Sequence, residues 1–276
     1  MSVITFWSND NIETGQTTTM AAIATYLSIE HNYKILVINS AYNDKTLEDA
    51  FWDQTKKIKI NMGSKKTDIG TGISGLLKIL PNKKDSPEVI TNYTKIIFKD
   101  RLELLTDNDI EYKDYVENRE QLAEITKLAS HYYDMVFIDL KGDFEDKITK
   151  EILNMSTVVV VNLTQRLRQI NECVKFIEDN EEIITKEKRI FVLGKYNPRL
   201  AKYTCKNIMR YIKEKQLSFV PFNNLLFEVG NEGKMADFFI KFRKVDENSA
   251  NGQFILSIQL IAERIMRKIK ESQMRV

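Results

Sequence analysis

The sequence lacks the signatures of several common protein classes. Of its 276 residues only two are cysteine, Cys173 and Cys205, and their spacing matches neither a disulfide framework nor a cysteine zinc site. The two histidines, His31 and His131, lie far apart, and no G-x-S-x-G or H-E-x-x-H motif occurs. These absences argue against a disulfide-stabilised domain, a zinc protein and the hydrolases that those two motifs identify.

Long apolar runs and a strong excess of charge are also missing. No run approaches membrane-spanning length, and the N-terminus shows no basic region followed by an apolar run and a small-residue cleavage site. We therefore expect a cytoplasmic protein. The formal net charge of +2 gives no strong preference for nucleic acid or for an acidic partner. The chain is long enough to bury a sizeable core, and no linker divides it, which predicts a single domain over residues 1–276.

Strand and helix patterns alternate along the chain. Strands are predicted at residues 3–7, 34–39, 101–106, 135–140, 157–162, 189–194 and 218–221. Helices are predicted at residues 17–31, 46–52, 87–97, 117–133, 168–184, 204–213 and 251–270. This alternation predicts an α/β fold with a doubly wound, mostly parallel sheet flanked by helices. In such a sheet the ligand crevice lies at the carboxyl ends of the strands.

The turn after the first predicted strand carries the main candidate site. It ends in Gly15-Gln16-Thr17-Thr18-Thr19, where a helix rich in small residues begins. A strand, a turn and a helix opening on Gly-x-Thr-Thr are typical of a phosphate-binding loop, in which backbone N–H groups and the helix N-terminus hold an anion. The general motif G-x-x-x-x-G-K-[ST] is not satisfied, because Asp10 replaces the first glycine and Gln16 replaces the lysine.

This loop resembles that of the ParA/MinD family of deviant Walker A ATPases, which reads K-G-G-x-G-K-T-T. On that pattern Asn11 replaces the signature lysine and Gln16 the second lysine, whereas Gly15, Thr17 and Thr18 are kept. The resemblance implies a P-loop NTPase-like fold, a homodimer, and ATP and Mg²⁺ as ligands of these residues, with the Thr17 hydroxyl on the metal. A threonine-rich helix start is also typical of an N-cap, and the loop taken alone favours the cap.

Residues at the ends of two predicted strands can also be compared with ParA/MinD family positions. Asp139 in F-I-D-L-K-G resembles the Walker B aspartate, which implies that its carboxylate holds a Mg²⁺ water; the alternative is an aspartate of a strand-end turn. The loop and the strand order together favour the Walker B position. Asn39 and Ala41 stand where the family carries two aspartates. Since Asn cannot act as a base and Ala cannot ligate a metal, we interpret Asn39 as a polar cap of its strand.

Two later segments are similar to family segments near the nucleotide base. Residues 219–237 resemble one of them, and Lys195-Tyr196-Asn197-Pro198 resembles the N-x-x-N-P turn, which implies that Asn197 meets adenine. The missing lysines have a further consequence, because Gln offers an amide dipole where Lys offers a full charge. Several kcal/mol of transition-state stabilisation is lost, judged by the roughly 3 kcal/mol that one oxyanion donor supplies. The sequence therefore predicts weak or absent ATP hydrolysis.

Taken together, the sequence resembles a ParA/MinD-like protein with a degenerate nucleotide site. The opening I-T-F-W-S is similar to the TadZ/CpaE branch, which implies a localisation or assembly scaffold for a Tad (Flp-type) pilus or secretion system, recruited to a pole or to the membrane periphery. One alternative is a partition ATPase that binds DNA non-specifically, although the lysine-rich residues 56–66 are more typical of a solvated loop. Another is a MinD-like regulator that lies on a membrane surface through its C-terminal helix; the broad apolar face of that helix favours packing against the sheet.

Overall fold

The computed structural model describes residues 2–9, 14–53, 72–80, 86–107, 109–142 and 144–274. Its strands are β1 (Ser2–Trp7), β2 (Ile35–Asn39), β3 (Lys95–Phe98), β4 (Leu102–Leu105), β5 (Met135–Asp139), β6 (Val158–Leu163), β7 (Arg189–Tyr196) and β8 (Ser218–Pro221). They form one sheet in the order β3-β4-β2-β5-β1-β6-β7-β8. The pair β3 and β4 is antiparallel, and every other neighbouring pair is parallel. The predicted mostly parallel sheet is therefore confirmed.

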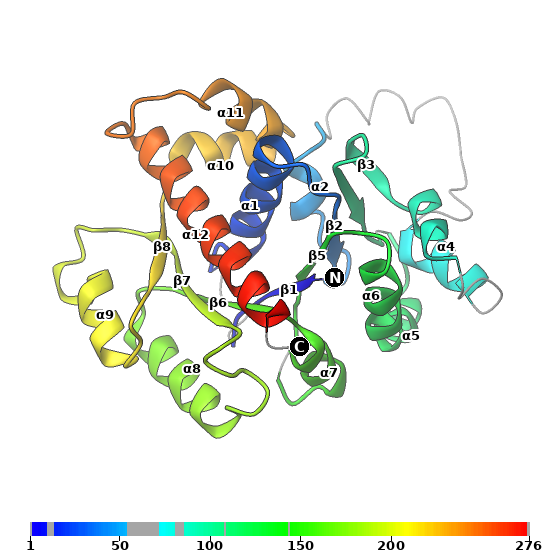
Figure 1. Cartoon of the computed structure of the whole chain (residues 1–276), viewed down its shortest axis with the longest axis horizontal. Helices are drawn as coiled ribbons and strands as arrows, with labels where there is room; N and C mark the ends of the chain where they lie inside the picture. The colour runs from blue at the N-terminus through cyan, green and yellow to red at the C-terminus, as the bar shows by residue number, and fades with distance from the viewer. Residues whose placement is uncertain are drawn as a thin grey trace.

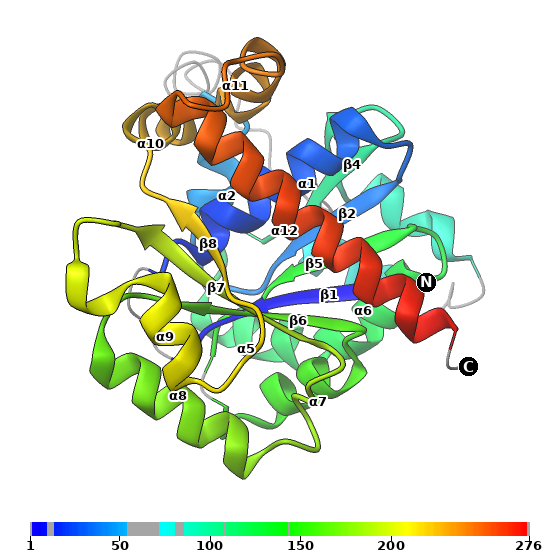
Figure 2. The ribbon, with the colours of Figure 1, turned by 60° about the vertical axis from the view of Figure 1, so that its left-hand side comes forward.

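Helices cover both faces of this sheet (Figure 1 and Figure 2). One face carries α1 (Gln16–Glu30), α2 (Thr46–Asp49), α10 (Asn224–Asn231), α11 (Met235–Lys241) and α12 (Ala250–Gln273). The other carries α4 (Gly72–Ile79), the 3-10 helix η2 (Pro87–Asn92), α6 (Leu122–Ser130), α7 (Lys147–Met155), α8 (Leu167–Asp179) and α9 (Cys205–Tyr211). Helix α5 (Tyr112–Glu120) has no buried residue, and a second 3-10 helix, η3, spans Ala201–Tyr203.

Successive residues of the central strands enter two different hydrophobic clusters. In β1, Val3 and Trp7 belong to the cluster on the α6 face, whereas Ile4 and Phe6 belong to the cluster on the α1 face. This is the period of two expected when successive side chains of a strand point to opposite faces. All six residues of β1 are buried, because β5 and β6 flank this strand and helices cover both of its faces. The sheet thus fixes the end of β1, from which the candidate loop departs.

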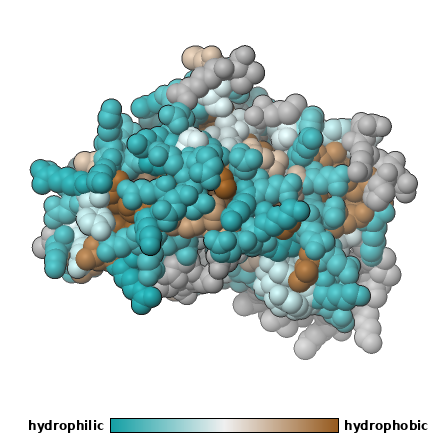
Figure 3. Space-filling model, turned by 90° about the horizontal axis from the view of Figure 1, so that it is seen from below, coloured by the Kyte–Doolittle hydropathy of each residue, from teal (hydrophilic) through white to brown (hydrophobic). Residues whose placement is uncertain are grey.

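The last helix packs into the core, as predicted. Along α12, Phe254, Ile258, Ile261 and Ile265 are fully buried and belong to the same cluster as α1. In the described part of the chain, no helix is both long and apolar enough to span a bilayer. On the face shown in Figure 3, hydrophilic residues cover most of the surface, and hydrophobic residues form small separate patches. The apolar face of α12 therefore stabilises the fold rather than remaining exposed.

Two predicted helices differ from the structure. Residues 87–97 were expected as one helix, but only the 3-10 helix η2 forms, and Lys95–Phe98 is the edge strand β3. A short apolar run does not distinguish helix from strand, and here the pairing with β4 decides. Residues 117–133 were also expected as one helix, but α5 and α6 are separated at Gln121. The sequence analysis did not predict α4, α7, α10 and α11.

Candidate functional site

A cavity of about 710 Å³ opens at the carboxyl ends of β1 and β5, beside the N-terminus of α1. Its described lining comes from the loop before α1, the segments after β2 and β5, the end of β7, and helices α10 and α11: Ser8, Thr14, Gly15, Gln16, Thr17, Thr18, Ala21, Ala41, Tyr42, Asp44, Thr46, Ala50, Leu140, Lys141, Gly142, Lys195, Leu226, Phe227, Gly230, Asn231 and Met235. Small-molecule sites span about 300–1,000 Å³. The cavity therefore has the size and the position of a ligand site in an open α/β sheet.

Two glycines set the path of the loop into α1. Gly15 is the N-cap residue and has φ 75° and ψ 15°, in the left-handed region that favours glycine. Gly194 in β7 lies directly against the loop, because a Cβ on Gly194 would stand 1.9 Å from the carbonyl oxygen of Thr14. The loop can pack on β7 only because residue 194 has no side chain. Its position, and hence the direction of α1, depends on both glycines.

The start of α1 faces the cavity with its backbone. Gln16, Thr17 and Thr18 form the first turn of the helix and line the cavity. The first N–H groups of an α-helix have no acceptor within the helix, and the helix dipole places a partial positive charge at this end. Together they make the end of α1 suited to an anion such as phosphate. The interpretation of the loop as a phosphate-binding element is consistent with this geometry.

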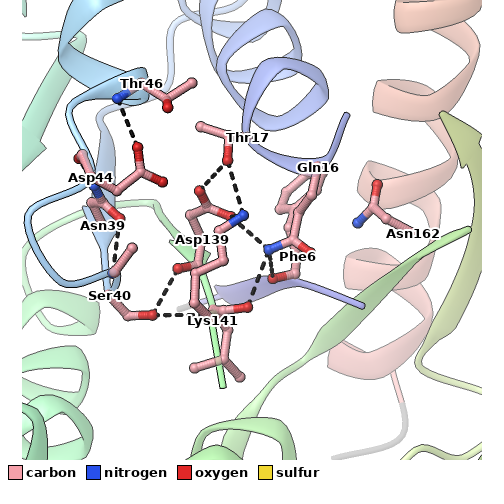
Figure 4. A network of polar contacts seen from close by, with 12 residues as sticks. Phe6, Gln16, Thr17, Asn39, Ser40, Asp44, Thr46, Asp139, Lys141 and Asn162 are labelled. Carbon is pink, nitrogen blue, oxygen red and sulfur yellow. Dashed lines mark hydrogen bonds and ion pairs between the residues drawn. The ribbon is translucent and has the colours of Figure 1, made fainter. Parts of the chain in front are cut away.

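Gln16 links α1 to the ends of two strands (Figure 4). Its Nε2 lies 2.6 Å from Asp139 Oδ1, 3.0 Å from the Phe6 carbonyl oxygen and 3.1 Å from the Leu140 carbonyl oxygen, and its two N–H donors are shared among these three acceptors. The residue is 3% exposed. The Gln16 side chain therefore serves as a buried connection between helix and sheet.

Thr17 reaches the same carboxylate. Its Oγ1 donates to Asp139 Oδ2 at 2.6 Å. The N-cap residue of α1 is Gly15, and no side-chain cap bond is present among the described residues, so the N-cap interpretation of the threonines is wrong. Lys141 completes the cluster, because its Nζ donates to Thr17 Oγ1 at 3.2 Å and forms an ion pair with Asp139 Oδ1 at 3.6 Å. Asp139 is fully buried. A buried carboxylate needs such partners to remain charged.

Ser40 and Asn39 hold the end of β2 beside this cluster. Ser40 Oγ donates to the Asp139 carbonyl oxygen at 2.8 Å and accepts from the Lys141 backbone N–H at 2.9 Å. These two bonds fix the backbone from which the Lys141 side chain departs. Asn39 Nδ2 donates to the Asp44 carbonyl oxygen at 2.8 Å, and Asn39 Oδ1 accepts from the Ala41 N–H at 3.0 Å. Asn39 thus organises the turn after β2, in agreement with its interpretation as a polar cap.

Positive charge outweighs negative charge among the described lining residues. Lys141 and Lys195 supply two cations, and Asp44 is the one acidic side chain that lines the cavity there. Lys195 has φ 50°, a left-handed conformation that non-glycine residues seldom adopt, and its Cγ would lie 3.4 Å from a Cβ on Gly15. Unusual backbone of this kind concentrates at functional sites. The two lysines favour an anionic ligand.

The structure brings together most of the predicted site residues. Gly15, Gln16, Thr17 and Thr18 line the cavity, and Asp139 joins Gln16 to Thr17 beneath it. Asn11 lies outside the described residues, as do residues 56–66. Asn197 is not among the lining residues; its Oδ1 accepts from the Arg199 N–H at 3.0 Å, and its contact with adenine stays a prediction.

The other lining residues include Lys141, Lys195 and Phe227, none of which was given a role from the sequence alone. Phe227 is 59% exposed, and its ring can stack against a planar group. Lys141 lies two residues after Asp139, so the rule that ligands bind at strand ends was a usable signal for it. For Lys195 and Phe227 the signal was the similarity of residues 195–198 and 219–237 to family segments near the base, which marked the segments but not these side chains.

Mg²⁺ does not fit these residues as they are arranged. The oxygen atoms it prefers here belong to Thr17 and Asp139, and these atoms already bond to Gln16, to Lys141 and to each other. The Lys141 ammonium donates to Thr17 Oγ1. Two unit charges 4 Å apart near a protein surface already repel by about 4 kcal/mol, and the double charge of Mg²⁺ would increase this repulsion. In the described residues no cluster of three or more His, Cys, Asp or Glu side chains offers another metal site.

Comparison with known proteins gives a match in fold and none in sequence. The sequence matches no protein-family model and no curated protein. A ParA family ATPase from Chlorobium tepidum superposes with a TM-score of 0.68 at 15% identity, covering 94% of this chain and 97% of the other. MinD from Pyrococcus horikoshii, complexed with Mg-ADP, gives 0.67 at 14% identity, covering 96% and 95%. A putative plasmid partition protein from Borrelia burgdorferi, bound to AMPPNP, gives 0.60 at 18% identity, covering 99% and 98%. The chain thus has the fold of the ParA/MinD P-loop ATPases.

Proposed function

We propose that this chain is a ParA/MinD-like nucleotide-binding protein whose hydrolytic activity is weak or absent. The observation that carries the proposal is the link between Gln16 and Asp139, which ties the residue at the P-loop lysine position to the sheet while the cavity above it stays open. Binding and turnover depend on different parts of this site.

Binding is supported by shape and charge. The N-terminus of α1 faces a cavity of about 710 Å³ that Lys141 and Lys195 also line, and these groups suit the phosphates of a nucleotide. Phe227 lies on the same cavity with an exposed ring, which suits stacking on a base. Two structures of the same fold are complexes with Mg-ADP and AMPPNP, and they support ADP or ATP as the ligand.

Weak turnover is supported by the scarcity, among the described residues of the site, of charged or ligating groups that could stabilise a transition state. Gln16 supplies an amide dipole, and its donor atom already bonds to Asp139 and two carbonyl oxygens. Asn39 is engaged in the turn after β2, and Ala41 carries no ligating group. Asp44 is the remaining acid among the described lining residues, and its Oδ1 accepts from the Thr46 N–H at 2.8 Å. Preorganised charge at the transferring phosphate is usually the largest contribution to catalysis.

The proposed biological role is that of a homodimeric localisation or assembly scaffold that contacts proteins of a Tad (Flp-type) pilus or secretion machine at a pole or at the membrane periphery. The similarity of residues 4–8 to the TadZ/CpaE branch supports this narrower role. The second candidate is a partition ATPase that binds DNA non-specifically, which the likeness to a Borrelia plasmid partition protein supports. Direct membrane binding through α12 is disfavoured, because most of its apolar residues pack into the core and Leu260 is the one large apolar side chain of this helix that is exposed.

The proposal is tested by titrating the purified protein with ATP and with ADP in a calorimeter, with phosphate release measured in parallel. We expect saturable binding with phosphate release far below that of a lysine-containing ParA/MinD ATPase assayed alongside. Absence of binding, or turnover equal to that enzyme, would overturn it. DNA binding measured over a range of salt concentrations separates the two roles, since a non-specific DNA binder loses affinity steeply as salt rises.

A further inference from the structure

We propose that the ammonium group of Lys141 is the built-in cation of this site and takes the place of Mg²⁺, so that the phosphates of a nucleotide bind without a divalent metal. The proposal rests on the proposed function, because it concerns how the same cavity holds its ligand. It assigns to Lys141 a binding role that neither the loop motif nor the fold supplies.

The position of the ammonium is fixed by backbone as well as side-chain contacts. The Lys141 N–H donates to Ser40 Oγ, which also donates to the Asp139 carbonyl oxygen, so the ends of β2 and β5 hold the residue in place. From there Nζ reaches Thr17 Oγ1 at 3.2 Å and Asp139 Oδ1 at 3.6 Å. The side chain is 37% exposed and lines the cavity. Its charge thus lies between the buried carboxylate and the ligand space.

The neutral side chain of Gln16 and the positive side chain of Lys141 together satisfy Asp139. The fully buried Asp139 needs one positive partner, and among the described residues Lys141 is the cation within 4 Å of it. A lysine at position 16 would place a second ammonium on the same carboxylate, whereas the neutral amide of Gln16 donates to it without repelling Lys141. The positive charge beside Asp139 therefore lies at the end of β5 and not at the start of α1.

The ammonium has the bonding capacity that the role requires. A lysine ammonium carries three N–H donors and no acceptor. Thr17 Oγ1 takes one donor and Asp139 attracts a second, which leaves the third for an oxygen of a ligand in the cavity. A metal ion bound to Thr17 would meet this ammonium at close range. The site therefore favours a phosphate group without its metal.

The test is ADP binding measured by calorimetry in EDTA and in excess MgCl₂, for the natural protein, Lys141→Gln and Lys150→Gln. Lys150 is a matched control, because it too pairs with an acid, Glu145, and is 39% exposed, but it does not line the cavity. We expect the natural protein and Lys150→Gln to bind ADP with the same affinity, and each of them to bind it equally well in EDTA and in MgCl₂. Lys141→Gln should lose at least about tenfold in affinity in EDTA, the change that corresponds to one charge-assisted hydrogen bond.

The possible outcomes test the role of Lys141 and the proposed nucleotide binding separately. Binding by the natural protein that requires Mg²⁺, or unchanged affinity of Lys141→Gln in EDTA, would overturn the inference and leave the proposed function standing. Absence of binding in both buffers would overturn both. The comparison of the two buffers needs no variant, so the inference stays testable even where Lys141→Gln does not fold.

Discussion

Gln16 and Asp139 are joined by a hydrogen bond of 2.6 Å from the amide nitrogen of one to a carboxylate oxygen of the other. Both residues are buried, and the same amide nitrogen also serves the carbonyl oxygens of Phe6 and Leu140. Gln16 thus connects the start of α1 to the ends of β1 and β5. This link lies at the cavity that Gln16 also lines.

Gln16→Ala should destabilise the fold. The substitution removes the donor from three buried acceptors, and a buried polar group left without its partner costs about 1–3 kcal/mol. We expect the free energy of unfolding in urea to fall by about 2–4 kcal/mol. The control is Gln259→Ala in α12, where the glutamine bonds to Glu263 at the surface, and this variant should unfold as the natural protein does. Equal unfolding curves for all three proteins would contradict a structural role for Gln16.

Gly194→Ala should displace the loop and weaken nucleotide binding. A methyl group at residue 194 would stand 1.9 Å from the carbonyl oxygen of Thr14, so either the loop or β7 must shift. The matched control is Gly230→Ala in α10, whose added methyl group meets no atom within 4 Å. We expect a lower melting temperature and weaker ADP binding for Gly194→Ala, and an equal or higher melting temperature for Gly230→Ala, because alanine favours a helix over glycine. Full binding by Gly194→Ala would show that the close packing of the loop on β7 is not required.

Asp146→Asn should make stability less dependent on acid pH. Burial alone raises the pKa of Asp146, but hydrogen bonds from the Arg119 guanidinium, the Ile148 N–H and the Thr149 hydroxyl outweigh it and hold the pKa below its usual value. The folded state therefore binds fewer protons than the unfolded state. The stabilisation is present above the unfolded-state pKa of about 3.9 and is lost as the pH falls through the folded-state value.

The experiment compares urea unfolding of the natural protein and Asp146→Asn at neutral pH and at about pH 3, below the unfolded-state pKa. Asn preserves the N-cap of α7, so the variant chiefly removes the negative charge that pairs with Arg119. We expect a loss of about 1 kcal/mol at neutral pH, the difference between a charged and a neutral hydrogen bond. The difference between the two proteins should narrow in acid, because the stabilisation is lost as the pH falls toward the folded-state pKa. A constant difference at both pH values would assign the effect to packing rather than to charge.

Much of the fold was predictable because its signals are local. Residues 135–140 and 157–162 are continuous apolar runs, and their burial on both faces in the centre of the sheet explains them. Asp139 was predictable for the same reason, since it ends such a run. Residues 95–98 were not, because their strand depends on pairing with β4 rather than on their own pattern.

The charges of the site were harder to predict than its position. The sequence shows Gln16 at the start of a helix, but not that its amide would bond to three acceptors at strand ends. The Lys141 backbone is held by Ser40, which joins β2 to β5 through contacts between residues about a hundred positions apart. Contacts of this kind are properties of the folded site, so a motif on a single segment cannot reveal them.

The most direct test of the proposed site is amide hydrogen exchange of the protein with and without ADP. The N–H groups at the start of α1 have no acceptor within the helix, so a bound phosphate should slow their exchange. We predict protection of residues 14–19 and of the segment around Lys141, with little change in the buried strands. Binding that leaves the start of α1 unprotected would place the nucleotide elsewhere and contradict the assignment of this cavity.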